Sequence, residues 1–252
     1  MINNFTKINI YEKPKSTSKL SSQLLYGEKF TIIQKKNNWL KIKTNYDNYI
    51  GYIKNKKFLI KFYPKFKVFS SKSTIYIKKR NKFFKTKKFL FFGSSIEKKS
   101  ENRTFIEFEK NKWIKKKHVK KLNHIEKNYI KIFKLFLGSK YLWGGKCVDG
   151  IDCSALIQIY FFYNRIFFPR DTKDQIKYCK KNTKKGFFKG DIIFWKGHVG
   201  ICLNQLNFLH AYGPKKKVLI MPIYYTLDLI RNTANLVVKK TSNLRMFNLF
   251  QN

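Results

Sequence analysis

The feature that most constrains the fold is a change in the spacing of apolar residues near residue 123. Before that point the apolar residues form short runs of strand length, separated by turn signals rich in Pro, Ser and Asn. The segment HIEKNYIKIFKLFLG then has apolar residues at helical spacing and ends at Gly138, a residue suited to a helix C-terminus. The chain therefore predicts an all-β N-terminal part and a C-terminal part that contains helices.

The N-terminal part reads as two related units. Residues 1–62 contain the runs INIYEKP, QLLYGEKFTIIQKK, NWLKIKT and YIGYIKN, and a small barrel is a natural closure for such strands. Residues 63–122 repeat the theme, since LLYGEKF…NNWLKI matches FLFFGSS…NKWIKK in outline. We expect two small β domains in tandem, at residues 1–62 and 63–122.

Residues 123–252 predict a domain of the α+β class. A Gly-containing loop, YLWGGKCVDGIDC, leads into the apolar segment CSALIQIYFFYN, which reads as a buried helix that begins at or near Cys153. DTKDQIKYC reads as a short helix with an Asp suited to its N-cap. DIIFW, HVGICLN, NFLHAY and KVLIMPI follow closely and predict an antiparallel sheet. A helix packed on such a sheet is an α+β arrangement.

The charge is extreme but predicts no specific partner. The 55 Lys and Arg against 14 Asp and Glu give a net charge of +41, which normally suggests nucleic acid or a membrane surface. Only six of the 55 are Arg, the usual forked donor to phosphates and guanine, and the Lys residues are spread along the chain. Lys, Asn, Ile, Phe and Tyr share AT-rich codons, so a base-composition bias accounts for the excess. Nucleic-acid binding driven by charge is kept as an alternative.

The N-terminus and the cysteines bear on the cellular compartment. MINNFTKINIYEKP has no apolar run of signal-peptide length, and no stretch approaches the ~20 apolar residues of a membrane span. The expected location is the cytoplasm, with the periplasm or cell wall as the alternative. The four cysteines show neither CxxC pairs nor zinc-ligand spacing, which fits reduced thiols. We expect no metal and no cofactor, and the sequence predicts no particular oligomeric state.

Cys153 is the candidate nucleophile. It lies where the Gly-containing loop runs into the apolar helix. The positive end of the helix dipole and the free N–H groups there stabilise a thiolate, which is the nucleophilic form. The same N–H groups are suited to an oxyanion in acyl transfer. Taken alone, a small buried core cysteine is the competing interpretation.

Two of the four histidines strengthen the catalytic interpretation. His198 begins one predicted strand and His210 lies in the next, so antiparallel pairing would place them side by side. One imidazole would then take the thiol proton while the other fixes its tautomer. Two hydrogen-bonded histidines in a sheet are the structural alternative. A zinc site is the other, but it lacks convincing third and fourth ligands.

The scarce acids cluster beside this site. Four of the 14 carboxylates fall within 26 residues, at Asp149, Asp152, Asp171 and Asp174. A substrate ammonium group needs a carboxylate, and Asp152 is the candidate. For the others, helix capping and turn formation are the preferred roles.

These segments together resemble the NlpC/P60 family of papain-like cell-wall peptidases. YLWGG, DCSALIQ, GDIIFW-x-GHVGI and LHA follow one another within about residues 125–222. The tandem β domains resemble the bacterial SH3 modules that often precede this catalytic domain. The resemblance implies a papain-like catalytic domain at residues 123–252, preceded by two small SH3-like β-barrels. The full arrangement resembles the γ-D-glutamyl-L-diamino acid endopeptidases that act on murein peptides.

The resemblance also implies roles for individual residues. Cys153 takes the nucleophile position, His198 the base position and His210 the third position, while Tyr141 of YLWGG assists the oxyanion. A second set matches a pocket for a free substrate amine: Asp152, Ser154, Arg170, Thr172 and, from DNYIGYI, Tyr49. Ala155 departs from the family pattern, which usually has Gly there, but the change removes no reacting group.

The implied activity is hydrolysis of γ-D-glutamyl-L-diamino acid bonds during recycling or turnover of peptidoglycan fragments. The implied partner is a murein peptide with a free N-terminal L-Ala. A non-catalytic protein that binds cell-wall fragments or anionic polymers is the alternative, although the intact Cys, His and His argue against it.

Overall fold

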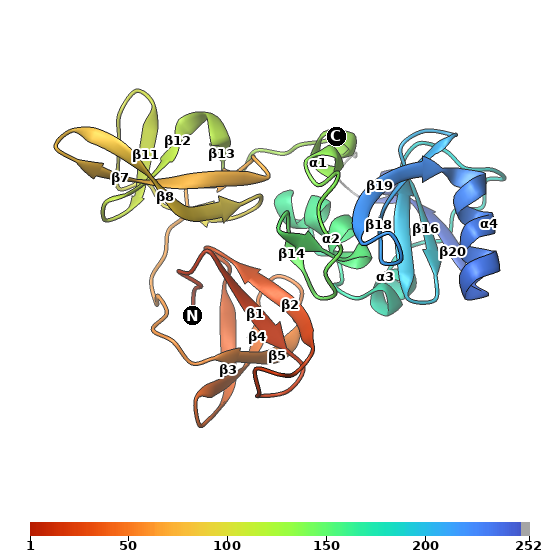
Figure 1. Cartoon of the computed structure of the whole chain (residues 1–252), viewed down its shortest axis with the longest axis horizontal. Helices are drawn as coiled ribbons and strands as arrows, with labels where there is room; N and C mark the ends of the chain where they lie inside the picture. The colour runs from red at the N-terminus through yellow and green to blue at the C-terminus, as the bar shows by residue number, and fades with distance from the viewer. Residues whose placement is uncertain (248–252) are drawn as a thin grey trace. The chain divides into compact units, whose positions relative to one another are not determined.

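A computed structural model describes residues 1–247, and this part of the chain divides into two compact units. Unit 1 comprises Met1–Ile125, and unit 2 begins at Glu126. Unit 1 contains strands β1 to β13, and unit 2 contains the α-helices and the remaining strands (Figure 1). No described helix is long and apolar enough to cross a membrane.

The first sheet of unit 1 consists of short amphipathic strands. Its strands, in spatial order, are β2 (Leu20–Leu25), β1 (Lys7–Tyr11), β5 (Ile50–Lys54), β4 (Trp39–Thr44) and β3 (Phe30–Lys36). In β4, Leu40 and Ile42 are buried and alternate with lysines, which is the period of a half-buried strand. Within residues 1–247 no strand pairing joins the edge strands β2 and β3, so the sheet is open and the predicted barrel closure is not found.

The second half of unit 1 forms two further sheets. The larger consists of β10 (Ser100–Glu101), β11 (Phe105–Glu109), β12 (Lys112–Lys115), β7 (Lys72–Lys79) and β8 (Lys82–Phe91). The smaller consists of β13 (Val119–Lys121), β6 (Phe66–Val68) and β9 (Ser95–Ile96), and a 3-10 helix at Lys116–His118 precedes β13. The described pairings leave these sheets open as well.

The two halves of unit 1 share a hydrophobic core. Tyr26 of the first half packs edge-on against Phe108, with ring centroids 5.4 Å apart, and against Phe62. Its backbone carbonyl accepts a hydrogen bond of 3.0 Å from the N–H of Ser95. The halves are therefore packed together and do not have wholly separate cores.

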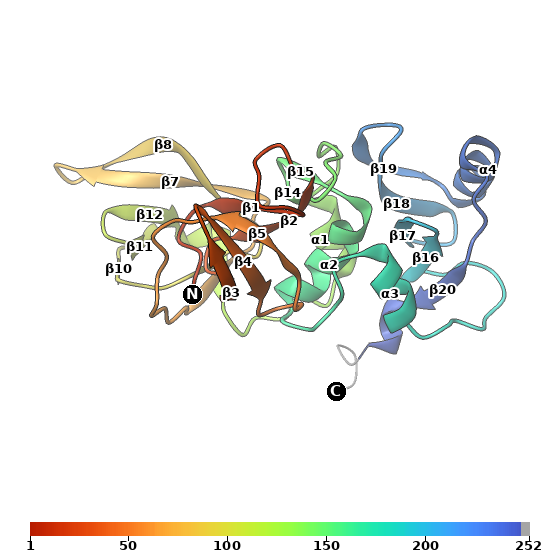
Figure 2. The same cartoon turned by 90° about the horizontal axis from the view of Figure 1, so that it is seen from below.

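Unit 2 is built on one antiparallel sheet with helices around it (Figures 1 and 2). Its strands, in spatial order, are β19 (Lys217–Pro222), β18 (Asn207–Tyr212), β17 (His198–Cys202), β16 (Asp191–Trp195) and β20 (Lys240–Asn243). The helices are α1 (Tyr129–Lys134), α2 (Cys153–Tyr163), α3 (Thr172–Tyr178) and α4 (Ile223–Ala234). A small hairpin of β14 (Lys146–Cys147) and β15 (Gly150–Ile151) precedes α2, and a 3-10 helix at Leu244–Met246 follows β20.

Helix α2 is the central element of unit 2. Most of its residues are apolar, and all but Phe162 are buried, including the polar Ser154 and Gln158. A helix of this composition is stable only inside a protein, and here it packs against α1, α3, β17 and β18. Because the helix is surrounded, the position of its first residue relative to the sheet is fixed.

Two helices of unit 2 differ from the sequence prediction. The helical spacing over residues 125–136 gives only the short helix α1, which begins after Asn128, whose side chain accepts a hydrogen bond from the N–H of Lys131. Helix α4 was not predicted. It is amphipathic and buries Ile223, Thr226 and Ile230 against the sheet.

Candidate active site

Cys153 is the first residue of α2, and the local sequence explains why the helix begins there. Asp152 has extended backbone angles, and its side chain accepts a hydrogen bond of 2.8 Å from the N–H of Ala155. This is the N-cap interaction that satisfies one of the free donors of a first helical turn. The thiol is thereby held at the N-terminal end of a buried helix.

The thiol of Cys153 lies beside the turn between β16 and β17. Its Sγ is 3.8 Å from the carbonyl oxygen of Gly197, and hydrogen bonds from the N–H of Val199 and the hydroxyl of Thr172 favour its thiolate. Burial acts in the opposite direction and is the larger effect, with the nearby Asp152 carboxylate adding to it, so the pKa of Cys153 is raised to about 12. The sequence predicted thiolate stabilisation by the helix terminus, but desolvation outweighs it. The resting thiol is protonated.

His198 and His210 are joined by a hydrogen bond. The Nε2 of His198 lies 2.9 Å from the Nδ1 of His210, as the predicted neighbouring strands require. His210 is fully buried, and its other ring nitrogen, Nε2, lies 3.3 Å from the Sδ of Met221 on β19. His198 is the first residue of β17, and the Cys153 thiol contacts the residues on either side of it.

Both imidazoles are neutral at ordinary pH. Burial lowers the pKa of His198 to about 4, and burial together with the neighbouring His198 lowers the pKa of His210 to about 2. Tyr212 stacks on His210 with ring centroids 4.8 Å apart, and Trp195 contacts His198 at 5.5 Å. The aromatic surroundings supply this desolvation, so the resting site holds a neutral thiol and two neutral rings.

Two glycines allow this arrangement of strands. Gly197 has a positive φ of 76° in the tight turn before His198, a conformation that favours glycine. At Gly200 a Cβ atom would lie 2.4 Å from the Cζ of Phe208 and 2.8 Å from the Cβ of His210. The absence of a side chain at Gly200 lets β18 bring His210 next to β17.

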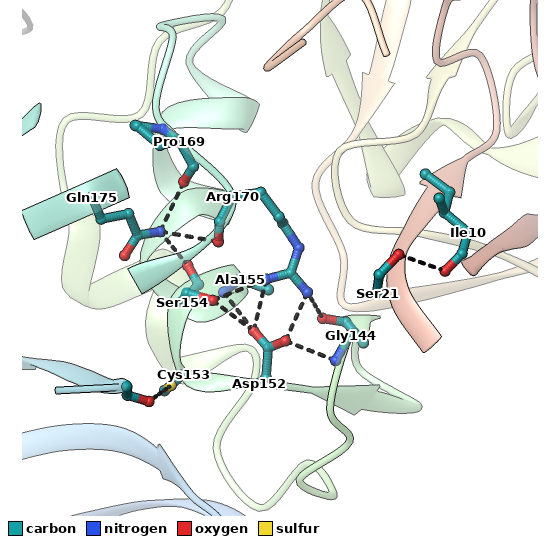
Figure 3. A network of polar contacts seen from close by, with 12 residues as sticks. Ile10, Ser21, Gly144, Asp152, Cys153, Ser154, Ala155, Pro169, Arg170 and Gln175 are labelled. Carbon is teal, nitrogen blue, oxygen red and sulfur yellow. Dashed lines mark hydrogen bonds and ion pairs between the residues drawn. The ribbon is translucent and has the colours of Figure 1, made fainter. Parts of the chain in front are cut away.

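Asp152 and Arg170 form a buried ion pair behind the nucleophile (Figure 3). The two guanidinium nitrogens of Arg170 donate to the two carboxylate oxygens at 2.7 and 3.0 Å. The N–H of Gly144 and the hydroxyl of Ser154 also donate to this carboxylate, at 2.8 and 3.2 Å. Together with the cap bond from Ala155, these donors occupy the lone pairs of the Asp152 side chain.

Ser154, Arg170 and Thr172 lie together around α2 and the start of α3. Arg170 donates to the hydroxyl of Ser154 at 2.9 Å. Gln175 of α3 donates to the backbone carbonyls of Ser154 and Pro169, both at 2.9 Å, which ties α3 to α2 (Figure 3). These contacts hold Thr172 where its hydroxyl reaches the thiol.

Tyr141 belongs to the same electrostatic neighbourhood. Its pKa is raised by burial first and then by the nearby Cys153 and Asp152. Its N–H donates to the carbonyl of Lys216 at 2.9 Å, and its ring lies beside Gly213. The phenol therefore stays protonated and keeps a hydrogen to donate.

Other predicted residues are placed differently. Tyr49 belongs to unit 1, just before β5, and its predicted contact with the substrate pocket stays a prediction. Asp171 occupies the N-cap position of α3, but its side chain makes no cap hydrogen bond, so the capping interpretation is wrong for that side chain. Burial raises the pKa of Asp171.

Zinc was the competing interpretation of the histidines. Among residues 1–247 no group of three or more His, Cys, Asp or Glu side chains is arranged to hold a metal ion. None of the four cysteines forms a disulfide with another described residue, and all four are buried.

Sequence reasoning missed Met221, Gln175 and Gly200 as parts of this site. Gly200 lies inside the motif GHVGI, so the motif marked the segment without revealing its packing role. Met221 carries no local signal, because only the pairing of β18 with β19 brings it to His210.

The arrangement has the parts that acyl transfer by a thiol requires. It has a thiol at a helix N-terminus, an imidazole whose two neighbours in the chain contact that thiol, a second imidazole bonded to the first, and a protonated phenol nearby. A model of the NlpC/P60 family matches residues 138–231, which include all four of these side chains. The chain contains an NlpC/P60 peptidase domain. It is a hydrolase of peptide bonds, and a cysteine nucleophile is characteristic of its family.

The NlpC/P60 domain is accompanied by an SH3 domain. Residues 10–58 match the model of the bacterial dipeptidyl-peptidase SH3 domain. The chain is 25% identical over 228 residues to a dipeptidyl-peptidase 6 of Lysinibacillus sphaericus, covering 81% of this chain and 84% of that protein. It is also 25% identical over 241 residues to a γ-D-glutamyl-L-lysine dipeptidyl-peptidase of Bacillus cereus, covering 82% and 72%.

A solved structure has the same fold. An NlpC/P60 family protein from Bacillus cereus superposes with a TM-score of 0.78 at 19% identity, covering 96% of this chain and 98% of that one.

Proposed function

We propose that this NlpC/P60 domain hydrolyses γ-D-glutamyl-L-diamino acid bonds of murein peptides, with Cys153 as nucleophile, His198 as base and His210 as the residue that orients the base. The observation that carries the proposal is the hydrogen bond between the two imidazoles beside the thiol of Cys153. A cysteine, a base and an oriented base are the parts of a nucleophilic triad.

The proposed reaction starts from the neutral pair. His198 takes the proton of the Cys153 thiol while Sγ attacks the γ-D-glutamyl carbonyl carbon. The protonated His198 then gives that proton to the leaving amine, and a thioester remains. Water attacks the thioester with His198 as base, which releases the acid and restores the thiol.

The negative charge that develops on the attacked carbonyl oxygen must be stabilised by hydrogen-bond donors. The N–H groups at the start of α2 provide a positive helix end, and we propose that the hydroxyl of Tyr141 adds a donor. A raised pKa suits this role, because the phenol keeps its proton while the oxyanion forms.

We propose further that the enzyme prefers substrate peptides with a free N-terminal L-Ala. The relative from Bacillus cereus is named for γ-D-glutamyl-L-lysine peptides, which supports the γ-D-glutamyl bond as the target. The free N-terminal L-Ala is a further part of the proposal. The proposed pocket residues of the catalytic domain are Asp152, Ser154, Arg170 and Thr172, and the role of Tyr49 stays a prediction. Arg170 and other donors already occupy the Asp152 carboxylate. We therefore propose that Asp152 holds the pocket wall in place and makes the electrostatic potential of the pocket more negative. It does not form an ion pair with the substrate on its own.

We also propose the domain bounds: an SH3-like domain at residues 1–62, a second SH3-like domain at residues 63–122, and the catalytic domain at residues 123–252. Two hairpin turns support the repeat. Asn37 precedes Asn38-Trp39 with a φ of 51°, and Asn111 precedes Lys112-Trp113 with a φ of 53°. The cytoplasmic location stays a prediction.

Product analysis with L-Ala-γ-D-Glu-diaminopimelate tests the proposal. We expect the wild-type protein to release L-Ala-γ-D-Glu and free diaminopimelate, and to cleave the same peptide with an acetylated N-terminus at least tenfold more slowly. Equal cleavage of both peptides would rule out recognition of the free amine but leave the peptidase intact.

The matched control for the nucleophile is a buried cysteine elsewhere. Cys153→Ser should remove detectable cleavage, while Cys179→Ser, in a cysteine that also lies buried near α3, should retain it. A Cys153→Ser protein with full activity would overturn the mechanism.

A further inference from the structure

The third residue of the triad has a partner of its own, the thioether of Met221. His210 is fully buried, and its Nε2 lies 3.3 Å from the Sδ of Met221. Met221 is itself 7% exposed and lies on β19, opposite Phe208 in the strand pairing. The contact is therefore built into the sheet and is shielded from water.

A thioether accepts a weak hydrogen bond and donates none. In a neutral imidazole one ring nitrogen carries a hydrogen and the other carries a lone pair. If the Nε2 of His210 carries the hydrogen, it donates to Met221. If it carries the lone pair, that lone pair faces a sulfur atom with no hydrogen to offer.

Whether the Nε2 of His210 carries a hydrogen decides which ring nitrogen of His198 is protonated. With hydrogen on Nε2, the Nδ1 of His210 must accept, so the Nε2–H of His198 donates across the 2.9 Å contact. The Nδ1 of neutral His198 then carries the lone pair, and this nitrogen is free to take the proton of Cys153 in the proposed reaction. In the opposite arrangement His210 donates, the hydrogen of His198 moves to Nδ1, and His198 has no lone pair left for the proton of Cys153.

We propose that Met221 is a positioning residue that selects the catalytically competent tautomers of His210 and His198. Phe208, Tyr212 and Trp195 surround the two rings and offer carbon faces. The thioether of Met221 lies within hydrogen-bond distance of the Nε2 of His210 and can only accept. An unsatisfied buried polar group is costly, so the productive tautomer should exceed the other roughly tenfold or more.

The tautomers exist in the resting protein and can be measured there. Only the claim that they are the ones needed for catalysis rests on the proposed function. Long-range proton–nitrogen correlation on ¹⁵N-histidine-labelled full-length protein distinguishes a protonated ring nitrogen from a bare one. We expect His210 to be protonated on Nε2 and His198 on Nε2. Protonation of His210 on Nδ1 in the wild-type protein would overturn the proposal, whether or not the peptide is cleaved.

Changes at the Met221 side chain test whether its sulfur is what selects the tautomers. Met221→Leu keeps the volume and removes the acceptor, so both tautomers of His210 should appear in comparable amounts. Loss of about half of the competent molecules should lower kcat about twofold with KM unchanged. Growth with selenomethionine in place of methionine keeps an acceptor that cannot donate, so it should keep the single tautomer and the rate.

Met246→Leu is the matched control, because Met246 lies in the 3-10 helix after β20 and is 39% exposed. It should change neither the tautomers nor kcat. An unchanged His210 spectrum in a folded Met221→Leu protein would contradict the proposal. If Met221→Leu does not fold, the wild-type spectrum still decides it. Failure of Cys153→Ser to abolish cleavage would instead contradict the proposed function and leave the tautomer result standing.

Discussion

At the scale of single residues, the site is governed by desolvation. Burial keeps the thiol of Cys153 protonated and both imidazoles neutral, although the thiol lies at a helix N-terminus. The charge-stabilising contribution of a helix end is about 0.3–1 kcal/mol, which is smaller than the cost of burying an ion. Charge separation is therefore expected to accompany substrate binding and not to precede it.

Alkylation of Cys153 tests this neutral resting state. Because the thiol pKa is raised to about 12, its reaction with iodoacetamide should keep accelerating from neutral to strongly alkaline pH. The rate is measured by mass spectrometry of the peptide that contains Cys153, with the buried Cys147 as internal control. A rate that levels off near pH 7 would show that a thiolate–imidazolium pair already exists.

The pair of Asp152 and Arg170 is a stability element behind the nucleophile. Arg170→Ala leaves the buried Asp152 carboxylate without its counter-ion, so unfolding by urea should require about 3–5 kcal/mol less free energy. Arg231→Ala is the control, because Arg231 pairs with Asp228 at the surface and should cost less than about 1 kcal/mol. Similar losses for both variants would contradict a special role for the buried pair.

At the scale of elements, the hairpin of β16 and β17 and the strand β18 bring the histidines together. The register places Trp195 opposite His198, and Cys202 opposite Phe208. Gly200 is the point of closest approach between β17 and β18. A small change there should therefore disturb His210 more than a similar change at the strand ends.

Gly200→Ala tests the packing of these strands. The new methyl group would meet the ring of Phe208 and the Cβ of His210, so we expect a loss of about 1–3 kcal/mol and lower activity. Gly213→Ala is the matched control for stability, because its Cβ would meet the ring of Tyr141 at an ordinary 3.6 Å. Thermal unfolding compares the two variants, and equal melting temperatures would argue against close strand packing at Gly200.

The hydrogen-bonded histidine pair predicts a dependence of stability on pH. Both folded-state pKa values lie below the ordinary histidine value of about 6.5. At any pH between a histidine's folded-state pKa and about 6.5, the unfolded chain therefore binds more protons than the folded chain. The stabilisation is complete above about pH 6.5 and is lost as pH falls toward 4, by up to about 1.4 kcal/mol per pH unit for each histidine. Urea titrations from pH 7 to 4 measure the slope, and His210→Asn should reduce it.

At the scale of the whole molecule, the charge of +41 is the dominant property. Like charges repel in the compact state, and this lowers stability without choosing a fold. Most of the described ion pairs, such as Lys98 with Glu101, are at the surface and contribute little. The basic surface also attracts anionic polymers nonspecifically. The salt dependence of this attraction tests the nucleic-acid alternative.

Salt should stabilise the folded chain. Between about 0.01 M and 0.15 M salt the Debye length falls from about 30 to about 8 Å, so repulsion between distant lysines is screened. We expect the melting temperature to rise by a few degrees, on the order of 1 kcal/mol. Sodium chloride and potassium chloride should act equally. A rise seen only with phosphate would indicate a bound anion, and binding of DNA that survives the higher salt would support a nucleic-acid function.

The sequence by itself determined the order of the β part and the α+β part, the family and the candidates Cys153, His198 and His210. It could do so because strand and helix periods are local, and because the motifs around these residues are short and contiguous. It did not determine that the β sheets are open, that Asp152 is bound by Arg170, or that Met221 meets His210. Only the tertiary structure decides these, because each depends on which strands and helices become neighbours and on how far their side chains are removed from water.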